Sequence, residues 1–387
     1  MAQWRTLATA PKYSEDMPWW SQVLSKLAQR RNLSVDEAKE SAYRIFTYLA
    51  EGKPETPVIL AGYFGGLTVK EPTIDELAGM AIAMEETKLF KFRFDVSKPV
   101  VTAGGTGGDT MKTINVTTPA VIIAAAAGAV AVKSAAKAFS STTGAADLAS
   151  TMGINVHAPP EVVKKCVEEL GTTVWASAMI YPWMEPLLKV RDMPTAPALF
   201  PLLQSLRLMI ATALNPFSVR RQLRGTALPH TELVAKVLSR VGYEKALVPV
   251  GYGSREDIRI DEFSSLGKTV VSELKPNGLV ETYEVKPEDL GVKRGDPAEV
   301  KARDTHEQNT KLVLGVLSGK DRSSRRDLIL LNAGGVLYLA DEATDLRDGY
   351  ELARNALDSG AALKKARQLV VGSGGDAEKL SALISSL

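Results

Sequence analysis

Residues 100–118 read VVTAGGTGGDTMKTINVTT, and the order of residue types in this stretch indicates one local structure. An apolar run stops at Val101, four glycines follow between Gly104 and Gly108, and an alanine-rich apolar segment begins after Thr118. Glycine lets the backbone turn sharply and approach a ligand closely. The stretch therefore predicts a strand, a glycine loop and a helix, an arrangement that binds phosphate or diphosphate through backbone N–H groups. A flexible surface loop is the alternative, but apolar residues flank the glycines on both sides and favour the phosphate site.

The loop differs from the commoner phosphate-binding motifs. It lacks the Lys-Ser/Thr ending of a Walker loop, and the spacing of Gly105, Gly107 and Gly108 departs from G-x-G-x-x-G. Both differences argue against an ATPase and against a nicotinamide-dependent enzyme. We therefore expect a sugar phosphate that carries a diphosphate, with a divalent cation nearby.

The composition fits a soluble globular protein of about two domains. The chain has 387 residues, 45% hydrophobic and 24% charged, with a formal net charge of +2, which gives no electrostatic case for nucleic acid as the main partner. The single cysteine, Cys166, excludes an internal disulfide, and a Cys/His zinc site is not expected with only three histidines. Residues 1–20 show no signal peptide, and the longest apolar run, 119–132, is too short to span a membrane. We expect a cytoplasmic protein.

The hydrophobic pattern changes along the chain. Residues 18–95 are predicted to be helical, because Ser34 and Thr73 each precede an apolar repeat of helical period as N-cap residues. After Pro99, short β-branched runs alternate with helical stretches, which indicates a mostly parallel sheet. The expected strands include Val100–Thr102, Ala129–Val132, Ala246–Val250, Thr269–Leu274 and Asp327–Leu331.

These patterns divide the chain into four segments. We expect an N-terminal helical domain over residues 1–95 and the glycine-rich, diphosphate-binding part of an α/β domain over 96–180. Residues 181–215 are rich in proline, leucine and methionine and are expected to return to the helical domain, and residues 216–387 complete the α/β domain. The predicted fold class is α/β, with a small all-helical domain and a larger α/β domain around a mostly parallel central sheet.

A second polar segment, KSAAKAFSSTTGAAD at 133–147, follows one of the predicted strands. Lys133 ends that strand, where the ligand-facing residues of an α/β sheet usually lie. Lys137, Ser140 and Ser141 follow in a loop of small residues, and two cations with several hydroxyls suit a phosphate. An ordinary solvated loop is the alternative, and the neighbouring glycine loop favours the phosphate site.

Asp261 and Glu262 form an adjacent acidic pair. Carboxylates of this kind bind Mg²⁺ in sites that also hold substrate phosphates, so the pair predicts a Mg²⁺ site opposite the diphosphate, although acidic pairs are also common on surface loops. No Ser/His/Asp arrangement is visible in the sequence. We therefore expect catalysis by positioning and charge stabilisation, with His157, His230 and His306 as structural or surface residues.

Several longer stretches match one known family, in the same order and over most of the chain. They include GTGGD (105–109) with Thr113 and INVTT (114–118), SSTTGAADLASTMGINV (140–156), and IDEFSSLGKTVVSEL (260–274). The helical stretches at 34–52, 73–84, 327–340 and 345–370 also match. Together they resemble the diphosphate signature, the serine-rich loop, the acidic metal-binding motif and the terminal helices of the anthranilate phosphoribosyltransferases.

The resemblance implies a small helical domain plus a larger α/β domain, a fold that is also nucleoside phosphorylase-like, and a homodimer formed through the helical part. It implies 5-phosphoribosyl diphosphate as a substrate between the domains and Mg²⁺ as cofactor. Asp261 and Glu262 would hold Mg²⁺, and Thr117 stands where the family has a metal-binding serine. The residues implied to bind 5-phosphoribosyl diphosphate are Gly105, Thr106, Gly107, Gly108, Asp109, Thr113, Asn115, Val116, Thr117, Thr118, Lys133, Lys137, Ser140 and Ser141.

The acceptor half of the implied site departs from the family. The family has His-Gly-Asn-Arg after the lysine, whereas this chain has Ser134, Ala135, Ala136 and Lys137. The asparagine that contacts anthranilate is therefore Ala136. The serine of the family's Gly-Ser-Ala-Asp motif is replaced by Ala145.

Two further acceptor positions differ. The family's His-Pro-Ala-Met motif appears here as Tyr181-Pro182-Trp183-Met184. Its carboxylate-binding arginine aligns near Gln204 or near Arg207, because residues 192–203 look like an insertion. The acceptor pocket that the resemblance implies therefore comprises Ala136, Tyr181, Trp183, Gln204 and Arg207, and it lacks the family's partners for anthranilate.

Two classes of function follow. The first is a Mg²⁺-dependent phosphoribosyltransferase, similar to the tryptophan-biosynthetic family, with a different and unknown small-molecule acceptor. The second is a non-catalytic relative that binds a phosphate-bearing ligand or nucleic acid, and a phosphorylase that uses free phosphate is a third option. Nucleic acid binding would rely on two basic clusters, Arg220, Arg221 and Arg224, and Arg322, Arg325 and Arg326, but the near-neutral net charge argues against it. The periodic apolar face of residues 38–49 predicts a homodimer.

Overall fold

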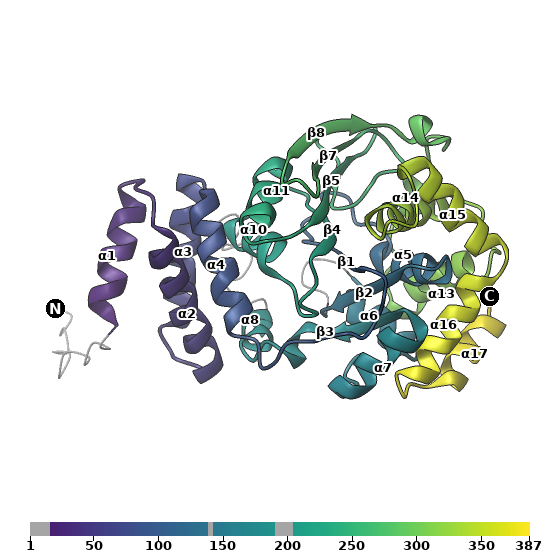
Figure 1. Cartoon of the computed structure of the whole chain (residues 1–387), viewed down its shortest axis with the longest axis horizontal. Coiled ribbons are helices and arrows are strands. Elements are labelled where there is room, and N and C mark those ends of the chain that lie inside the picture. Colours follow the sequence, from purple (N-terminus) through teal and green to yellow (C-terminus); the bar gives the residue numbers. More distant parts are fainter. Residues whose placement is uncertain (1–15, 138–141, 190–203) are drawn as a thin grey trace, which may run out of the picture.

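The computed structural model describes residues 16–137, 142–189 and 204–387. The N-terminal helices lie at one end of the molecule and the α/β part at the other (Figure 1). No helix among the described residues is long and apolar enough to cross a membrane. Ser140, Ser141 and the expected insertion at 192–203 fall outside the described residues.

The helices of the N-terminal segment begin where the sequence predicts. Ser34 and Thr73 accept hydrogen bonds from the N–H groups of Glu37 and Glu76, and both sites form complete capping boxes. Gly52 ends the first of these helices with a left-handed φ of 66°, which glycine adopts without strain. The helices are α1 (Met17–Ala28), α2 (Val35–Glu51), α3 (Thr56–Lys70) and α4 (Ile74–Glu86).

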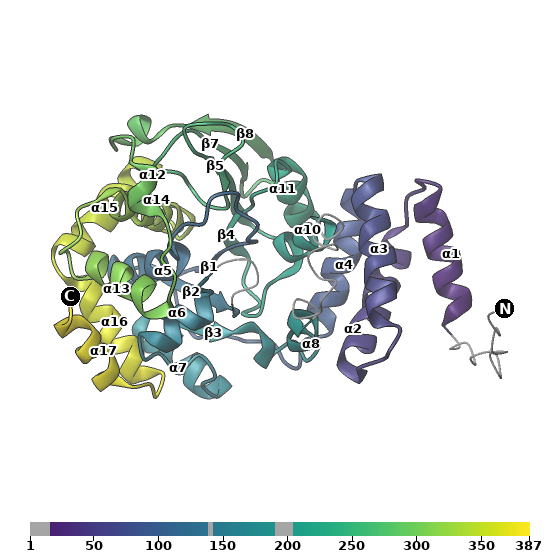
Figure 2. The ribbon, with the colours of Figure 1, turned by 180° about the vertical axis from the view of Figure 1, so that it is seen from behind.

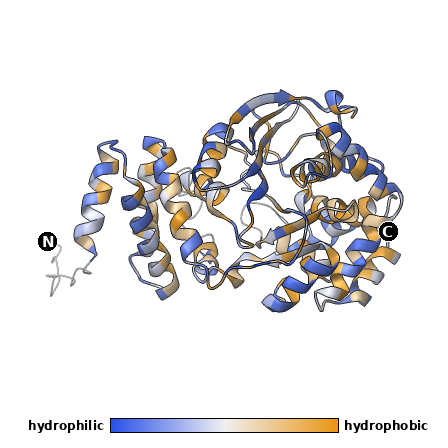
Figure 3. Ribbon diagram, viewed as in Figure 1, coloured by the Kyte–Doolittle hydropathy of each residue, from blue (hydrophilic) through white to orange (hydrophobic). Residues whose placement is uncertain are grey.

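Helix α4 is the centre of this helical layer. It packs against α2 on one side and against α10 (Gln204–Ala213) and α11 (Thr231–Arg240) on the other. Figure 3 shows α4 as largely hydrophobic, as its position between these helices requires. Helix α8 (Met184–Lys189) lies against α2, so the described part of segment 181–215 packs on the helical layer.

The sheet is mixed but mostly parallel, as predicted, with the strand order β3-β2-β1-β4-β5-β7-β8. The pairs from β3 to β5 are parallel, while β7, β8 and the short β6 add antiparallel pairs at the other edge. The carboxyl ends of β1, β2 and β4 therefore meet at one edge of the sheet. The strands are β1 (Val100–Gly105), β2 (Val130–Ala135), β3 (Thr172–Ala176), β4 (Arg221–Gly225), β5 (Lys245–Tyr252), β6 (Arg259–Ile260), β7 (Thr269–Leu274) and β8 (Val280–Val285).

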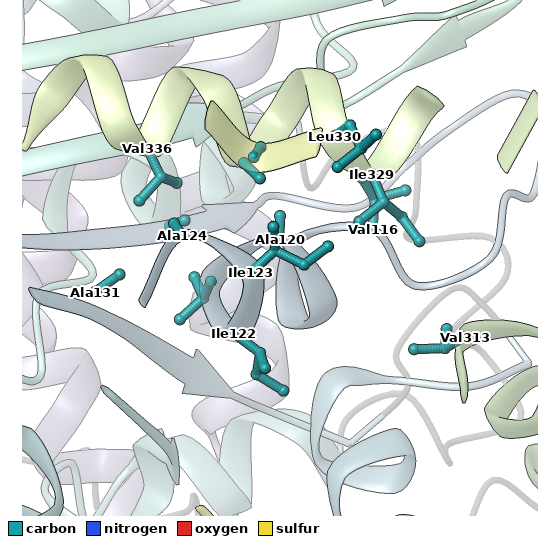
Figure 4. Packing of buried hydrophobic residues seen from close by; sticks show 14 of the residues in the cluster. Val116, Ala120, Ile122, Ile123, Ala124, Ala131, Val313, Ile329, Leu330 and Val336 are labelled. Carbon is teal, nitrogen blue, oxygen red and sulfur yellow. The ribbon is translucent and has the colours of Figure 1, made fainter. Parts of the chain in front are cut away.

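Helices cover both faces of this sheet. One face packs on α5 and α14, and Figure 4 shows Ala120 and Ala124 of α5 facing Leu330 and Val336 of α14. The C-terminal helices α16 and α17 lie beside α13 at the end that carries the C-terminus (Figure 2). The helices of this part are α5 (Thr117–Ala126), α6 (Ala145–Thr151), α7 (Pro160–Leu170), α12 (Pro297–Val300), α13 (His306–Leu317), α14 (Ser324–Leu339), α15 (Leu346–Asp358), α16 (Ala361–Gly372) and α17 (Ala377–Ser385), with short 3-10 helices at Ser177–Met179 and Pro287–Leu290.

One predicted strand is wrong. Asp327–Leu331 lies inside helix α14. The helix is buried on several sides, and its residues Leu328 to Leu330 are fully inaccessible to solvent. A helix surrounded by protein carries apolar residues on every face, so its sequence lacks the helical period that would separate it from a buried strand.

Candidate active site

The strand ends of β1, β2 and β4 open into a cavity of about 260 Å³. Helices α3, α8 and α10 cover the opposite side, so the cavity lies between the sheet and the helical layer. In open α/β sheets, ligands bind at this edge, outside the carboxyl ends of the strands. The predicted site residues that line the cavity are Gly105, Thr106, Gly107, Asp109, Thr113, Asn115, Thr117, Lys133, Ala136, Lys137, Arg207, Asp261 and Glu262.

The glycine loop follows β1 directly and has no room for side chains. A methyl group built on Gly105 would lie 1.9 Å from Oδ2 of Asp261. Gly107 and Gly108 have φ values of 69° and 93°, and the N–H of Gly107 donates to Asp261 Oδ2 at 2.5 Å. The loop and the acidic pair therefore form one unit, although they lie far apart in the sequence.

The segment after the loop leads into helix α5. Asn115 Oδ1 accepts from the N–H of Thr118 at 3.3 Å, which places Thr117 at the start of the helix and at the cavity wall. Val116, Thr118 and Gly108 do not line the cavity, and the first two are buried in the core behind it.

Three carboxylates converge beside the loop. Oxygen atoms of Asp109, Asp261 and Glu262 lie within 4.8 Å of one another, and the backbone N–H of Asp261 donates to Asp109 Oδ1 at 2.9 Å. Removal from water, and then the negative charge of Asp261, raise the pKa of both Asp109 and Glu262 well above the usual values. Oxygen Oε2 of Glu262 is buried without a hydrogen-bond partner among the described residues. Such a cluster fits a divalent cation, and the sequence predicted two of its three members.

Two buried cations lie beside the carboxylates. Lys133 is buried at the end of β2, where its Nζ donates to the carbonyl of Ser134 at 2.5 Å. Burial, together with the positive charge of Arg224, lowers the pKa of Lys133 to about 7. Arg224 was expected in a surface cluster with Arg220 and Arg221, but it is buried on β4 and lines the cavity.

The described end of the serine-rich loop is hydrogen-bonded to helix α13. Thr143 lines the cavity, and its Oγ1 lies 3.1 Å from Nδ1 of His306 and accepts from Asn309 Nδ2 at 3.0 Å. Both partners belong to α13, so this helix holds the described end of the loop. His306, which was expected as a structural or surface residue, therefore contacts this loop. Lys137, at the other end of the loop, is exposed at the cavity wall.

The structure places only two of the five acceptor residues implied by the resemblance at the cavity wall. Ala136 and Arg207 line the cavity, whereas Tyr181, Trp183 and Gln204 do not. The ring of Trp183 stacks on Phe46 of α2 with centroids 4.0 Å apart, and the hydroxyl of Tyr181 accepts from the N–H of Asn215. Both rings are thus part of the core between the helices and the sheet. The wall expected from them consists instead of Pro57, Leu60, Ala61, Met184, Leu187, Leu188, Leu206, Ile210 and Leu214.

Comparison with known proteins agrees with this architecture. Residues 97–363 match the a/b domain of a glycosyl transferase family. The anthranilate phosphoribosyltransferase of Roseiflexus sp. (strain RS-1) is 34% identical over 360 residues, which cover 93% of this chain and 99% of the relative. The enzyme of the same name from Anaeromyxobacter dehalogenans (strain 2CP-C) is 35% identical over 350 residues, 90% of this chain and 97% of the relative.

Solved structures show the same fold. The crystal structure of anthranilate phosphoribosyltransferase from Thermus thermophilus has a TM-score of 0.75 at 30% identity and covers 91% of this chain and 99% of its own. The Saccharomyces cerevisiae enzyme in complex with PRPP and Mg has a TM-score of 0.73 at 21% identity, covers 97% of this chain and 99% of its own, and shares the fold. With these matches over nearly the full length, the chain is a phosphoribosyltransferase and belongs to the anthranilate phosphoribosyltransferase family.

Proposed function

We propose that this enzyme transfers the phosphoribosyl group of 5-phosphoribosyl diphosphate (PRPP) to the nitrogen of an acceptor other than anthranilate, with Mg²⁺ as cofactor. The observation that carries the proposal is the contact between the glycine loop and the acidic pair, in which Gly107 donates to Asp261 and Gly105 leaves no space for a side chain. A diphosphate on the loop would lie directly beside the carboxylate cluster. The solved yeast relative in complex with PRPP and Mg supports this pairing of ligands.

The donor would bind through the residues at the strand ends. Lys133 and backbone N–H groups of the glycine loop would contact the diphosphate. Asp109, Asp261 and Glu262 would hold Mg²⁺, with the Thr117 hydroxyl as a further ligand. Mg²⁺ would neutralise negative charge on the diphosphate.

The proposed reaction depends on how the two substrates are positioned, and it needs no nucleophilic side chain. The bond between C1 of the ribose and the diphosphate oxygen breaks, the diphosphate leaves with the electron pair, and the acceptor nitrogen forms the new bond to C1 and releases a proton. Loop N–H groups and the Lys133 ammonium stabilise the charge that develops on the leaving oxygen. The apolar cover of α3, α8 and α10 would limit the access of water, which would otherwise compete with the acceptor.

The altered acceptor is proposed from the side chains that face the cavity. Ala136 offers no amide, and the hydroxyl of Ser134 is already hydrogen-bonded to that of Ser177. Each lost hydrogen bond to a charged group should cost about 1.5–3 kcal/mol. Two such losses would weaken anthranilate binding about 100-fold or more. The apolar wall from α3, α8 and α10 would suit a larger acceptor.

Calorimetric titration with PRPP, with and without Mg²⁺, tests the proposed binding of PRPP as the donor substrate. We expect binding that requires Mg²⁺ and that disappears when Asp261 and Glu262 are both replaced by alanine while the circular dichroism spectrum is unchanged. Equal affinity in EDTA would contradict the proposal. Loss of anthranilate fluorescence during turnover tests the acceptor half, and an efficient reaction with micromolar KM would show that anthranilate is the acceptor after all.

The non-catalytic alternative has little support among the charged side chains. Arg322 and Arg326 pair with Asp358, and Arg325 pairs with Asp321. In the other cluster, Arg221 pairs with Asp341. Arginines that are already paired attract phosphate backbones weakly, so a nucleic-acid face is not favoured.

A further inference from the structure

Arg207 reaches across the cavity from the helical layer to the glycine loop. It belongs to helix α10, which covers the side of the cavity opposite the sheet. Its guanidinium lies against the backbone of Gly108, because a methyl group built on Gly108 would be 2.3 Å from Nη1 and 2.7 Å from Cζ. The resemblance implied that Arg207 contacts the acceptor, whereas this contact places its charged group beside the loop that is proposed for the diphosphate.

The half-buried guanidinium of Arg207 has no partner in the protein. It forms no hydrogen bond and no ion pair within the described residues, not even with the nearby carboxylates of Asp109 and Asp261. Mg²⁺ would engage both of these carboxylates, so they are not its partners once the metal is bound. Removing a cation from water without pairing it is unfavourable, and an anion beside the guanidinium would stabilise it.

The part of the loop that Arg207 contacts also carries two backbone donors without partners. The N–H groups of Gly108 and Asp109 have no acceptor among the described residues. Successive N–H groups of a loop, placed next to a guanidinium, form a site for an anion such as a phosphoryl group. The N–H groups of this loop that do donate within the protein are those of Thr106, Gly107 and Thr110.

We propose that Arg207 binds the diphosphate of PRPP, together with the N–H groups of Gly108 and Asp109, and that it does not bind the acceptor. The inference rests on the proposed transferase function and adds a donor-binding residue from the helical layer. Lys133 would hold the diphosphate from the sheet side of the cavity and Arg207 from the helical side. As the bond between C1 and the diphosphate oxygen breaks, the electron pair stays on the diphosphate, and the guanidinium would stabilise this charge.

Calorimetric titrations with two probes, PRPP and inorganic diphosphate, test the proposal in the presence of Mg²⁺. Arg207→Met should weaken the binding of both probes at least about tenfold, because a contact with a charged group is lost, while binding still requires Mg²⁺. Arg207→Lys should recover part of the loss, since lysine keeps the charge but not the two parallel hydrogen bonds of a guanidinium. Arg240→Met removes an exposed arginine from α11, which packs on α10, and as the matched control it should bind both probes as the wild type does.

The other outcomes contradict the inference in different ways. Wild-type affinity of Arg207→Met for both probes would remove Arg207 from the donor site and leave the transferase proposal intact. A loss for PRPP alone would assign the guanidinium to the ribose 5-phosphate part of the donor, and an equal loss in Arg240→Met would show that the effect is not specific. If Arg207→Met did not fold, full affinity of Arg207→Lys for both probes would be the contradicting result. A wild-type protein that binds neither probe would reject the inference and the transferase proposal together.

Discussion

Gly105 is the point where the glycine loop and the acidic pair meet without space for a side chain. We expect Gly105→Ala to weaken Mg²⁺-dependent PRPP binding at least about 100-fold, or about 2.8 kcal/mol, because the added methyl group would lie 1.9 Å from the Asp261 carboxylate and must displace it. Calorimetry measures the loss. Gly315→Ala is the control, since its methyl group would meet only Asp321 at an ordinary 3.6 Å. Normal donor binding by Gly105→Ala would show that the loop is not the diphosphate site.

Lys133 makes donor binding depend on pH. Its pKa is lowered to about 7, so the free protein carries the ammonium mainly below that pH. A bound diphosphate favours the charged form, so binding at pH 8 should take up close to one proton, and the affinity should fall as the pH rises from about 7 to 9. Calorimetry in buffers of different ionisation enthalpy measures the uptake. Lys133→Met should lower the proton uptake by close to one proton, while any protons exchanged by Asp109 and Glu262, whose pKa values are raised, remain. An unchanged uptake in that variant would contradict this assignment.

At the scale of single residues, the residues that the sequence places together at the cavity are those whose type is dictated locally. Gly107 adopts a positive φ, and Asp261 accepts a backbone N–H beside two further carboxylates, so both belong to short recognisable motifs. Arg224 could not be assigned in this way. An arginine in a basic stretch is usually exposed, and its burial depends on which helix crosses the end of its strand.

Among the elements, helix α14 holds the acidic motif in place. The side chain of Asn332 accepts from the N–H of Phe263 and donates to its carbonyl, both at 3.0 Å, directly after Glu262. We expect Asn332→Ala to lower the free energy of unfolding by about 2–4 kcal/mol, because a buried backbone group without a partner costs about 1–3 kcal/mol. Urea denaturation measures this change. Mg²⁺-dependent PRPP binding should weaken as well, since Asp261 and Glu262 lose their support.

A matched variant separates stability from positioning. Asn309→Ala removes another buried asparagine, but one that contacts Thr143 and the start of α13 rather than the acidic motif. It should also destabilise the protein while leaving the Mg²⁺ requirement of donor binding intact. If Asn332→Ala binds PRPP with wild-type affinity and Mg²⁺ dependence, Asn332 has no part in positioning the carboxylates.

The helices and strands differ in how well their type and boundaries can be predicted from their own sequences. Capping residues fix the starts of α2 and α4, and alternation with helices reveals the parallel strands. Segment 327–331 was misassigned as a strand because α14 is buried on all sides. Tyr181 and Trp183 were expected at the acceptor wall, yet their rings pack on the helical layer. The surroundings of a buried helix or ring depend on residues that are far away in the sequence, and no local pattern in a single sequence indicates those contacts.

At the scale of the whole molecule, the apolar face of residues 38–49, from which a dimer was predicted, is not available as a subunit interface. The apolar residues 38–49 of α2 are already buried against α4 and α8 within the chain. Helix α3 is apolar on all sides, and its Val58 and Val69 remain 72% and 60% exposed. They are 11 positions apart, which places them on the same side of the helix. Two exposed valines on one face of an apolar helix give a strip that a second copy of the chain would bury.

We therefore expect a two-fold dimer through α3, with twice the 41.6 kDa chain mass in sedimentation at micromolar concentration. Replacing both Val58 and Val69 by glutamate should yield monomers. A two-fold interface repeats every substitution on both sides, so the new charges would face one another in a contact without water. Val371→Glu alters an equally exposed valine, at 65%, on α16 at the opposite end of the molecule (Figure 1), and should leave the mass unchanged. A dimer that survives both glutamates would place the interface elsewhere, and a monomeric wild type would refute the assembly itself.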